Sequence, residues 1–419
     1  MRPVDVAGPA RSGGRWKRRY AILWLLSGGF AAGVLLAEGA VRLYAAFDSR
    51  FAKMMGALDP LVVKIVPSGD FSYRQRPYAL FDYPNGTVAT ANTLGYRGPV
   101  VAIPKPPGTF RIVLLGESTT HGYGVNDDQT IDAAMRRLLA AEYPALAIEV
   151  VNLAFDGYDS YALWERLRID GLRFEPDLVI VNAGINDVRD SQFNDLQDHD
   201  ARTLLYSGVL RALRATARNG HPPLWVRVKH LSYIARLPGL VRTAIATKRD
   251  NLYRLRHQPH LAAVEYFGRN LQRIANLLAD RHVPIVFSTP PSSLTTKYAS
   301  ADTSSRTYWI VDAGTTQRYR ERLARRMAEL AAELRRDGRP VTYVHPDLPP
   351  SLFLDDCHLT PEGNARVAEV LVAAIKPYIR EWERGSHGRR LSPRDHTWTV
   401  QGENPAAHDA AHRLRGARL

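Results

Sequence analysis

From Phe110 onward, short apolar runs rich in β-branched residues alternate with longer segments of helical periodicity, and this alternation limits the possible folds. The runs predict five strands, at Arg111–Leu115, Ala147–Leu153, Asp177–Ala183, Val283–Ser288 and Val341–His345. Helices are expected at Ile131–Glu142, Tyr161–Arg173, Val264–Arg281, Gln317–Asp337 and from Pro361, after a Thr360 N-cap, to about Trp382. Apolar strands separated by helices pair in parallel and are covered on both faces. The sequence therefore predicts an α/β fold with right-handed crossovers.

A basic N-terminus leads into an apolar run of membrane length. Residues 1–19 carry six Lys/Arg against one acid, and the uncharged run extends from Tyr20 to Ala37. A helix of that length rises about 27 Å, close to the hydrocarbon thickness of a bilayer. Positive flanks tend to stay inside, so we expect a cytoplasmic N-terminus, one inner-membrane helix over 20–44 and a periplasmic remainder. A cleaved signal peptide is the alternative, because small residues near the end of the run permit cleavage.

Composition divides the rest of the chain. Residues 45–109 contain turn signals and predict an extracytoplasmic linker region with a hairpin. The main domain is expected over 110–383, interrupted by an insertion at about 188–260. Residues 384–419 lack periodicity and are expected to form a disordered tail.

The insertion is strongly basic. Residues 202–257 hold twelve Lys/Arg and one acid, with helix-like stretches at Ala201–Ala217 and Val241–Arg256. Such a segment lies on an anionic membrane, receives an acidic polymer or covers an active site as a lid. The structural alternative is a solvated helical face. A nucleic-acid partner is not expected, because an extracytoplasmic position removes it.

Four short segments with chemically useful residues accompany this pattern. Three of them, Gly116-Glu117-Ser118-Thr119, Ala154-Phe155-Asp156-Gly157 and Gly184-Ile185-Asn186-Asp187, follow the first three strands, and Asp355-Asp356-Cys357-His358 precedes the last helix. The carboxyl ends of parallel strands meet at one edge of the sheet, where open α/β sheets bind ligands. We therefore expect these segments to lie together.

Ser118, His358 and Asp355 form a minimal acyl-transfer set. A serine hydroxyl is a weak nucleophile until a base removes its proton, and a carboxylate orients that base. Asp355 precedes His358 by three residues on the loop that enters the last helix, so it is the expected partner. Asp356 and Cys357 are interpreted as spacers.

In this order, the four segments resemble the SGNH/GDSL hydrolase family, whose blocks centre on a Gly-Asp-Ser turn, a glycine loop, Gly-x-Asn-Asp and Asp-x-x-His. The resemblance covers about residues 110–378. It implies a flavodoxin-like three-layer α/β/α sandwich with a five-stranded parallel sheet, preceded here by the transmembrane helix. It also implies catalytic roles for Ser118 as nucleophile, His358 as base and Asp355 as orienting acid, with an oxyanion hole from Ser118, Gly157 and Asn186.

Two positions depart from the family pattern. Glu117 stands where the family usually has Asp, and its longer arm is expected to change the hydrogen bonds of the turn with little effect on the chemistry. Ala154 replaces a glycine of many members, which would tighten that loop.

These assignments predict a membrane-anchored serine ester hydrolase or O-acyl transferase that acts on an acetylated envelope glycan or a lipid. A membrane-associated lipase or lysophospholipase is the alternative enzyme, and a non-catalytic polysaccharide-binding module is the alternative from another class. No cofactor is expected, and His199, His221 and His230 lack metal-ligand spacing, so no metal site is predicted. His121 either lines the pocket or is a polar turn residue, and Asp187 is expected to cap or to hydrogen-bond locally.

Overall fold

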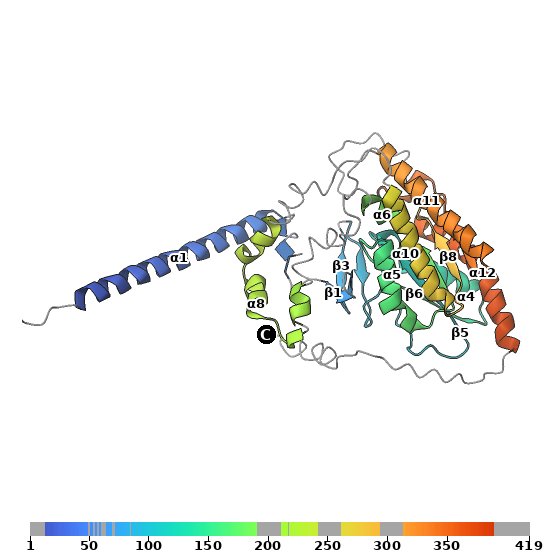
Figure 1. The fold of residues 1–419 in the computed structure, drawn as a ribbon, viewed down its shortest axis with the longest axis horizontal. Coiled ribbons are helices and arrows are strands. Elements are labelled where there is room, and N and C mark those ends of the chain that lie inside the picture. Colours follow the sequence, from blue (N-terminus) through green and yellow to red (C-terminus); the bar gives the residue numbers. More distant parts are fainter. Residues whose placement is uncertain are drawn as a thin grey trace, which may run out of the picture.

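The computed structural model describes residues 13–48, 51–52, 55–56, 58–59, 64–68, 72–83, 85–190, 211–216, 218–241, 261–293 and 313–388. Its centre is a five-stranded parallel sheet in the order β6-β5-β7-β8-β9 (Figure 1). The strands are β5 (Thr109–Gly116), β6 (Ala147–Asn152), β7 (Leu178–Asn182), β8 (Ile285–Ser288) and β9 (Val341–Val344). Each predicted strand is found in this sheet, so the predicted α/β fold is confirmed.

Helices cover both faces of the sheet and make three layers. On one face lie α4 (Ile131–Glu142) and α12 (Pro361–Gly388), and on the other α5 (Ser160–Ile169), α10 (Leu261–Ala279) and α11 (Ala313–Arg336). Successive side chains of a strand point to opposite faces. In β5, Ile112 and Leu114 accordingly join the core under α4 and α12, while Val113 and Leu115 join the core under α5, α10 and α11. Both faces of β5 are buried, and its sequence is therefore a continuous apolar run.

The last helix starts as predicted and ends later than predicted. Gly363 N donates to Thr360 Oγ1 at 3.1 Å, so Thr360 caps α12 and Pro361 occupies its first position. The helix continues to Gly388, beyond the end expected near Trp382. Residues 389–419 of the expected tail lie outside the described residues.

The segment between the N-terminal helix and the sheet contains two hairpin-like pairs where one hairpin was expected. β1 (Ile65–Ser68) pairs antiparallel with β2 (Ser72–Gln75), and β3 (Leu80–Asp82) with β4 (Val88–Thr90). Shorter elements are α3 (Ser118–His121), α6 (Ile185–Asp190), η1 (Asp127–Gln129), η2 (Gly171–Phe174) and η5 (Pro350–Leu352).

At the N-terminus, α1 (Gly13–Phe47) projects from the rest of the protein (Figure 1). Within its stretch Arg19–Phe47, an 18-residue window has a mean hydropathy of 1.9, and the stretch is long and apolar enough to cross a membrane. Within the basic insertion, the described helices include α8 (Leu224–Leu231) and η3 (Ile234–Arg236). No helix was expected at 224–231. Residues 211–216 are helical as predicted, whereas 201–210 and 242–256 lie outside the described residues.

Candidate active site

The turn that follows β5 presents Ser118 at the carboxyl edge of the sheet. Thr120 packs so closely over Gly116 that a Cβ atom at position 116 would overlap it, so only glycine fits there. Ser118 begins the single turn of α3, which Gly122 ends in the left-handed conformation at φ +87°. This tight turn leaves Ser118 half-buried.

A chain of hydrogen bonds joins the serine, the histidine and the aspartate expected to act together. His358 Nε2 lies 2.8 Å from Ser118 Oγ, and His358 Nδ1 lies 2.6 Å from Asp355 Oδ2. The backbone N–H groups of Cys357 and His358 donate to Asp355 Oδ1 at 3.0 and 2.8 Å. Because the carboxylate holds the Nδ1 proton, Nε2 is left to accept the hydroxyl of Ser118.

The turn that carries Ser118 (the nucleophile turn of the expected triad) and the loop Asp355–His358 (the histidine loop) also contact each other directly. Thr119 Oγ1 donates to the Cys357 carbonyl oxygen at 3.1 Å. Ser293, just after β8, donates its hydroxyl to the Asp355 carbonyl oxygen at 2.9 Å and its N–H to the Asp356 carbonyl oxygen at 3.0 Å. The aspartate loop is therefore fixed from two strands of the sheet.

The environment sets the ionisation of this trio. Burial lowers the pKa of His358, but the Cys357 sulfur and the Asp355 carboxylate raise it, and the pKa ends well above 6.5. Burial raises the pKa of the Cys357 thiol, which is therefore uncharged at neutral pH, so Asp355 is the charge that favours the imidazolium. Burial also acts to raise the pKa of Asp355, yet its hydrogen bonds to His358 and to backbone N–H groups lower the pKa overall.

The two other expected segments lie at the same edge. Gly157 has φ +78°, and a Cβ atom there would lie 2.9 Å from the Tyr73 hydroxyl, so this loop position requires glycine. Asn186 is buried in α6 and donates one N–H of its side-chain amide to the Tyr158 carbonyl oxygen at 2.7 Å. Asp187 accepts from the N–H and the hydroxyl of Ser160, which is the local hydrogen bonding expected of it.

A family model decides what kind of protein this is. The model for the GDSL-like lipase/acylhydrolase family matches residues 114–366, well over half of the chain. The chain belongs to the GDSL-like lipase/acylhydrolase family. This GDSL-like protein is accordingly a serine hydrolase that acts on esters.

Solved structures match the fold only distantly. A catalytic mutant of the acetylxylan esterase Axe2 from Geobacillus stearothermophilus is 16% identical, with a TM-score of 0.38, over 64% of this chain and 94% of that one. A GDSL-like lipase from Bacteroides thetaiotaomicron is 14% identical, with a TM-score of 0.34, over 65% and 88% of the two chains. The acetyl xylan esterase AlAXEase is 17% identical, with a TM-score of 0.34, over 64% and 100%. No curated protein matches the chain.

In this GDSL-like hydrolase, the unusual Glu117 has a defined structural role. Its side chain is fully buried, and its carboxylate accepts the N–H of Gly184 at 2.7 Å, of Ile185 at 3.2 Å and of Asn186 at 2.7 Å. These groups include N–H groups at the start of α6, which have no partner within the helix and favour a negative charge. Glu117 therefore joins the nucleophile turn to the helix that carries Asn186.

The structure also shows a second histidine–aspartate pair in the hydrolase, which the sequence analysis missed. His121 is completely buried, with Nδ1 2.9 Å from Asp156 Oδ1 and Nε2 hydrogen-bonded to the Gln75 side chain. The Tyr83 hydroxyl lies 3.4 Å from the same Nδ1. His121 is thus a buried link between the nucleophile turn, the Gly157 loop and the N-terminal segment. Its partners are distant in sequence, so spacing did not indicate them.

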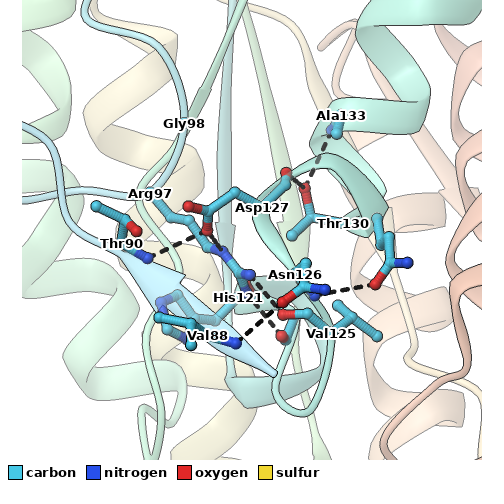
Figure 2. Close-up of polar contacts among 12 residues, drawn as sticks. Val88, Thr90, Arg97, Gly98, His121, Val125, Asn126, Asp127, Thr130 and Ala133 are labelled. Carbon is cyan, nitrogen blue, oxygen red and sulfur yellow. Dashed lines mark hydrogen bonds and ion pairs between the residues drawn. The ribbon is translucent and has the colours of Figure 1, made fainter. Parts of the chain in front are cut away.

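Arg97 binds the loop that follows α3 (Figure 2). Its buried guanidinium donates to the carbonyl oxygens of His121 (2.8 Å), Gly122 (2.6 Å) and Val125 (2.6 Å), and pairs with Asp127 Oδ1 at 2.6 Å. β4 adds backbone N–H bonds from Val88 to Asn126 and from Thr90 to Asp127. The loop then places the Tyr123 ring 4.3 Å from the His358 ring, measured between centroids. The N-terminal segment therefore buttresses one wall of the site.

Among the described residues, one group of side chains has donor atoms spaced as metal ligands. The donor atoms of Asp355, Cys357 and His358 lie within 4.8 Å of one another. Both ring nitrogens of His358 are already hydrogen-bonded, to Ser118 and to Asp355. The hydrogen bonds of the serine site account for this grouping.

Proposed function

We propose that Ser118, His358 and Asp355 are the catalytic triad of this hydrolase, which cleaves or transfers an ester-linked acyl group. The observation that carries the proposal is the continuous hydrogen-bonded chain from Ser118 Oγ through His358 to Asp355. The substrate class that we favour is an acetylated envelope glycan or a lipid, because the family acts on esters and α1 is long and apolar enough to cross a membrane.

The reaction follows from this geometry. His358 Nε2 takes the Ser118 proton while Oγ attacks the ester carbonyl, and the resulting anion accepts hydrogen bonds from the Ser118 and Gly157 N–H groups and the free N–H of the Asn186 amide. When the tetrahedral intermediate collapses, His358 returns the proton to the leaving alcohol, and the acyl group remains on Ser118. Water or an acceptor hydroxyl then attacks the acyl-enzyme and gives its proton to His358, which passes it to the departing Ser118 Oγ as the acid or a new ester is released.

The first test is labelling of the full-length protein with a fluorophosphonate probe. We expect the wild type to be labelled and Ser118→Ala to be unlabelled, because the probe traps only a serine activated by a base. Wild-type protein denatured before the probe is added is the control and should not react. A folded wild type that takes no label would contradict the proposal and favour the non-catalytic binding module.

The activity is expected to depend on the protonation of His358. The base works only when neutral and its pKa is raised, so kcat/KM should climb with pH to a midpoint above 6.5 and be lost as pH falls below it. Asp355→Asn should move the midpoint down, because it removes the charge that favours the imidazolium. Ser293→Ala, which removes an uncharged hydroxyl bound to the Asp355 carbonyl oxygen, is the matched control and should leave it in place. pH profiles of ester hydrolysis measure both, and a wild-type midpoint below 6.5 would refute the assignment.

Asn186→Ala tests the third oxyanion donor. Removal of such a donor typically costs about 3 kcal/mol, so kcat should fall by roughly 100-fold or more with KM little changed. Asp187→Asn, which alters the neighbouring bond to Ser160, is the matched control and should affect stability more than kcat. An unchanged kcat in Asn186→Ala would remove this residue from the oxyanion hole.

For its location, we propose a single-pass anchor with the hydrolase domain on the extracytoplasmic side. The support is α1, whose apolar side chains are exposed along its length; Leu25, Phe30 and Leu36, for example, are each 75% exposed. The basic residues before it favour a cytoplasmic N-terminus. Cleavage as a signal peptide is the competing outcome, and the mass of the mature protein distinguishes the two.

The same anchor favours one second candidate function, a membrane-associated lipase or lysophospholipase. A tethered domain lies close to lipid esters, and the basic insertion suits an anionic surface. Hydrolysis of micellar lysophospholipid compared with an acetylated oligosaccharide separates the two substrates.

A further inference from the structure

The helix α8 of the basic insertion presents an apolar face to its surroundings. Its exposed residues are Leu224 (77%), Trp225 (40%), Val228 (48%) and Leu231 (69%). Positions 224, 228 and 231 are spaced four and three residues apart, so they share one side of the helix, with Trp225 at its margin. A helix of a water-exposed surface shows the reverse pattern, with its polar side outward.

The opposite side of α8 is held in place, so the exposed side has a fixed orientation in the protein. Val226 is fully buried, and His230 Nδ1 lies 3.1 Å from Asp59 Oδ2. Arg236 donates to the same Asp59 oxygen at 2.7 Å and to the Met55 carbonyl oxygen at 3.0 Å. The apolar face is thus what remains after the helix has packed.

The end of α8 and the residues just after it are also attached to α1, at Glu38 and Arg42. The Glu38 carboxylate accepts from the Ser232 hydroxyl (2.8 Å) and from the N–H groups of Tyr233 (2.9 Å) and Ile234 (3.0 Å). Arg42 donates to the Leu231 carbonyl oxygen at 2.5 Å. Glu38 directly follows the uncharged run that ends at Ala37, and α8 is drawn crosswise to α1 near this end (Figure 1). If the uncharged run 20–37 of α1 fills the hydrocarbon core of a bilayer, α8 lies at the level where that run leaves it.

The charge around this face has the sign that phospholipid headgroups attract. Residues 211–241 contain six Lys/Arg and no acid. Within α8, Arg227 and Lys229 fall on either side of the apolar stripe, as successive residues of a helix turn by about 100°. The Lys229 ammonium lies 5.5 Å from the centre of the Trp225 ring. Apolar residues flanked by cations and an indole ring are the composition of a helix that lies in the membrane interface.

We propose that α8 lies in the headgroup layer of the membrane that α1 crosses, with Leu224, Val228 and Leu231 in the acyl chains and Arg227 and Lys229 among anionic phosphates. This proposal rests on the anchoring part of the proposed function. The two contacts, α1 through the bilayer and α8 along it, fix the orientation of the hydrolase domain relative to the membrane surface. The solvated face and the lid considered for the insertion are the outcomes that the test must separate from this one.

Nitroxide labels on the full-length protein test the proposal. Three single-cysteine variants in a Cys357→Ser background, Leu35→Cys on α1, Val228→Cys on α8 and Arg366→Cys on α12, are reconstituted into vesicles of phosphatidylglycerol and phosphatidylcholine. Collision of each label with oxygen, which partitions into lipid, and with a water-soluble nickel chelate is measured by power saturation. We expect the Leu35 and Val228 labels to favour oxygen several-fold and the Arg366 label to favour nickel. All three positions are exposed in the protein alone, so the labels disturb no packing.

Each outcome has one meaning for the proposal. A Val228 label with the nickel preference of Arg366 overturns the membrane contact, and if Leu35 still favours oxygen, the anchor stands without it. If Leu35 favours nickel, the anchoring proposal fails, while the Val228 label still decides whether α8 enters lipid. As a second variant, Leu224→Glu with Leu231→Glu should shift the Val228 label from oxygen toward nickel and leave the Leu35 label unchanged. A Val228 label that stays in lipid in this variant would contradict the assigned face.

Discussion

Replacing Ser118 by alanine is expected to lower kcat for p-nitrophenyl acetate by about 10⁵-fold, and His358→Ala by a similar factor. In the proposed mechanism the two residues act in one step, since His358 Nε2 removes the proton from the hydroxyl that lies 2.8 Å away. Without the hydroxyl there is no acyl-enzyme, and without the imidazole the hydroxyl is not activated. What remains comes from binding and the oxyanion donors alone.

The double variant Ser118→Ala, His358→Ala sharpens this test. Because the residues work as a unit, the double variant should be no slower than either single variant, whereas independent contributions would multiply. Ser293→Ala, which removes a hydroxyl bound to the Asp355 loop but outside the proposed chemistry, is the matched control and should keep most of the activity. Losses that multiply, or a Ser118→Ala enzyme with a tenth of the wild-type kcat, would refute the triad.

The second large effect is expected at Glu117. The two carboxylate oxygens of Glu117 together accept three backbone N–H groups, and glutamine replaces one of these oxygens by an NH₂ group, which cannot accept. The change also removes a buried charge near the Arg320 guanidinium. The loss of buried partners of this kind costs about 3 kcal/mol, which for a domain of this size lowers Tm by roughly 6–12 °C. Asn186 is held by the same carboxylate, so kcat should fall as well. Thermal unfolding and ester hydrolysis of the full-length protein measure the two effects.

Glu117→Asp is the matched control for that change. It restores the residue typical of the family and keeps the charge, but its shorter arm does not reach α6 in the same way. We expect a Tm between those of the wild type and Glu117→Gln. A Glu117→Gln protein as stable as the wild type would show that these hydrogen bonds contribute little. Glu117 in place of Asp is expected from the sequence to have little effect on the chemistry, and the kcat of Glu117→Asp tests that expectation.

Local signals were sufficient to predict much of the fold. The β5 run is apolar at successive positions because both of its faces are buried, and that pattern predicted a parallel sheet. Thr360 and Pro361 predicted the start of α12 because capping depends only on neighbouring residues. The three-residue spacing of Asp355 and His358 likewise predicted a contact, since one turn of chain brings the two side chains together.

Features that depend on distant contacts were not predicted. Arg97 and His121 are held by partners in other segments, and no local pattern distinguishes a buried arginine from a surface one. In the insertion, no helix was expected at 224–231, although Leu224, Val228 and Leu231 have helical periodicity. Two prolines, Pro222 and Pro223, directly precede them, and such dipeptides are typical of loops. Proline at a helix start is compatible with the helix, and the contact with α1 holds it there.

Asp355 and His358 share a single turn of chain, and the N–H groups of Cys357 and His358 bind the same carboxylate that orients the ring. The proposed acid and base therefore lie on one loop that is already ordered by its own hydrogen bonds, and Ser118 lies on a different loop. Only the distance between these two loops has to be set when the protein folds, and the Thr119 to Cys357 bond spans that gap. The histidine loop leads straight into α12, which packs against α4, so this trio is assembled only in a protein whose α12 has docked. Enzyme turnover during refolding would then report on the docking of this helix.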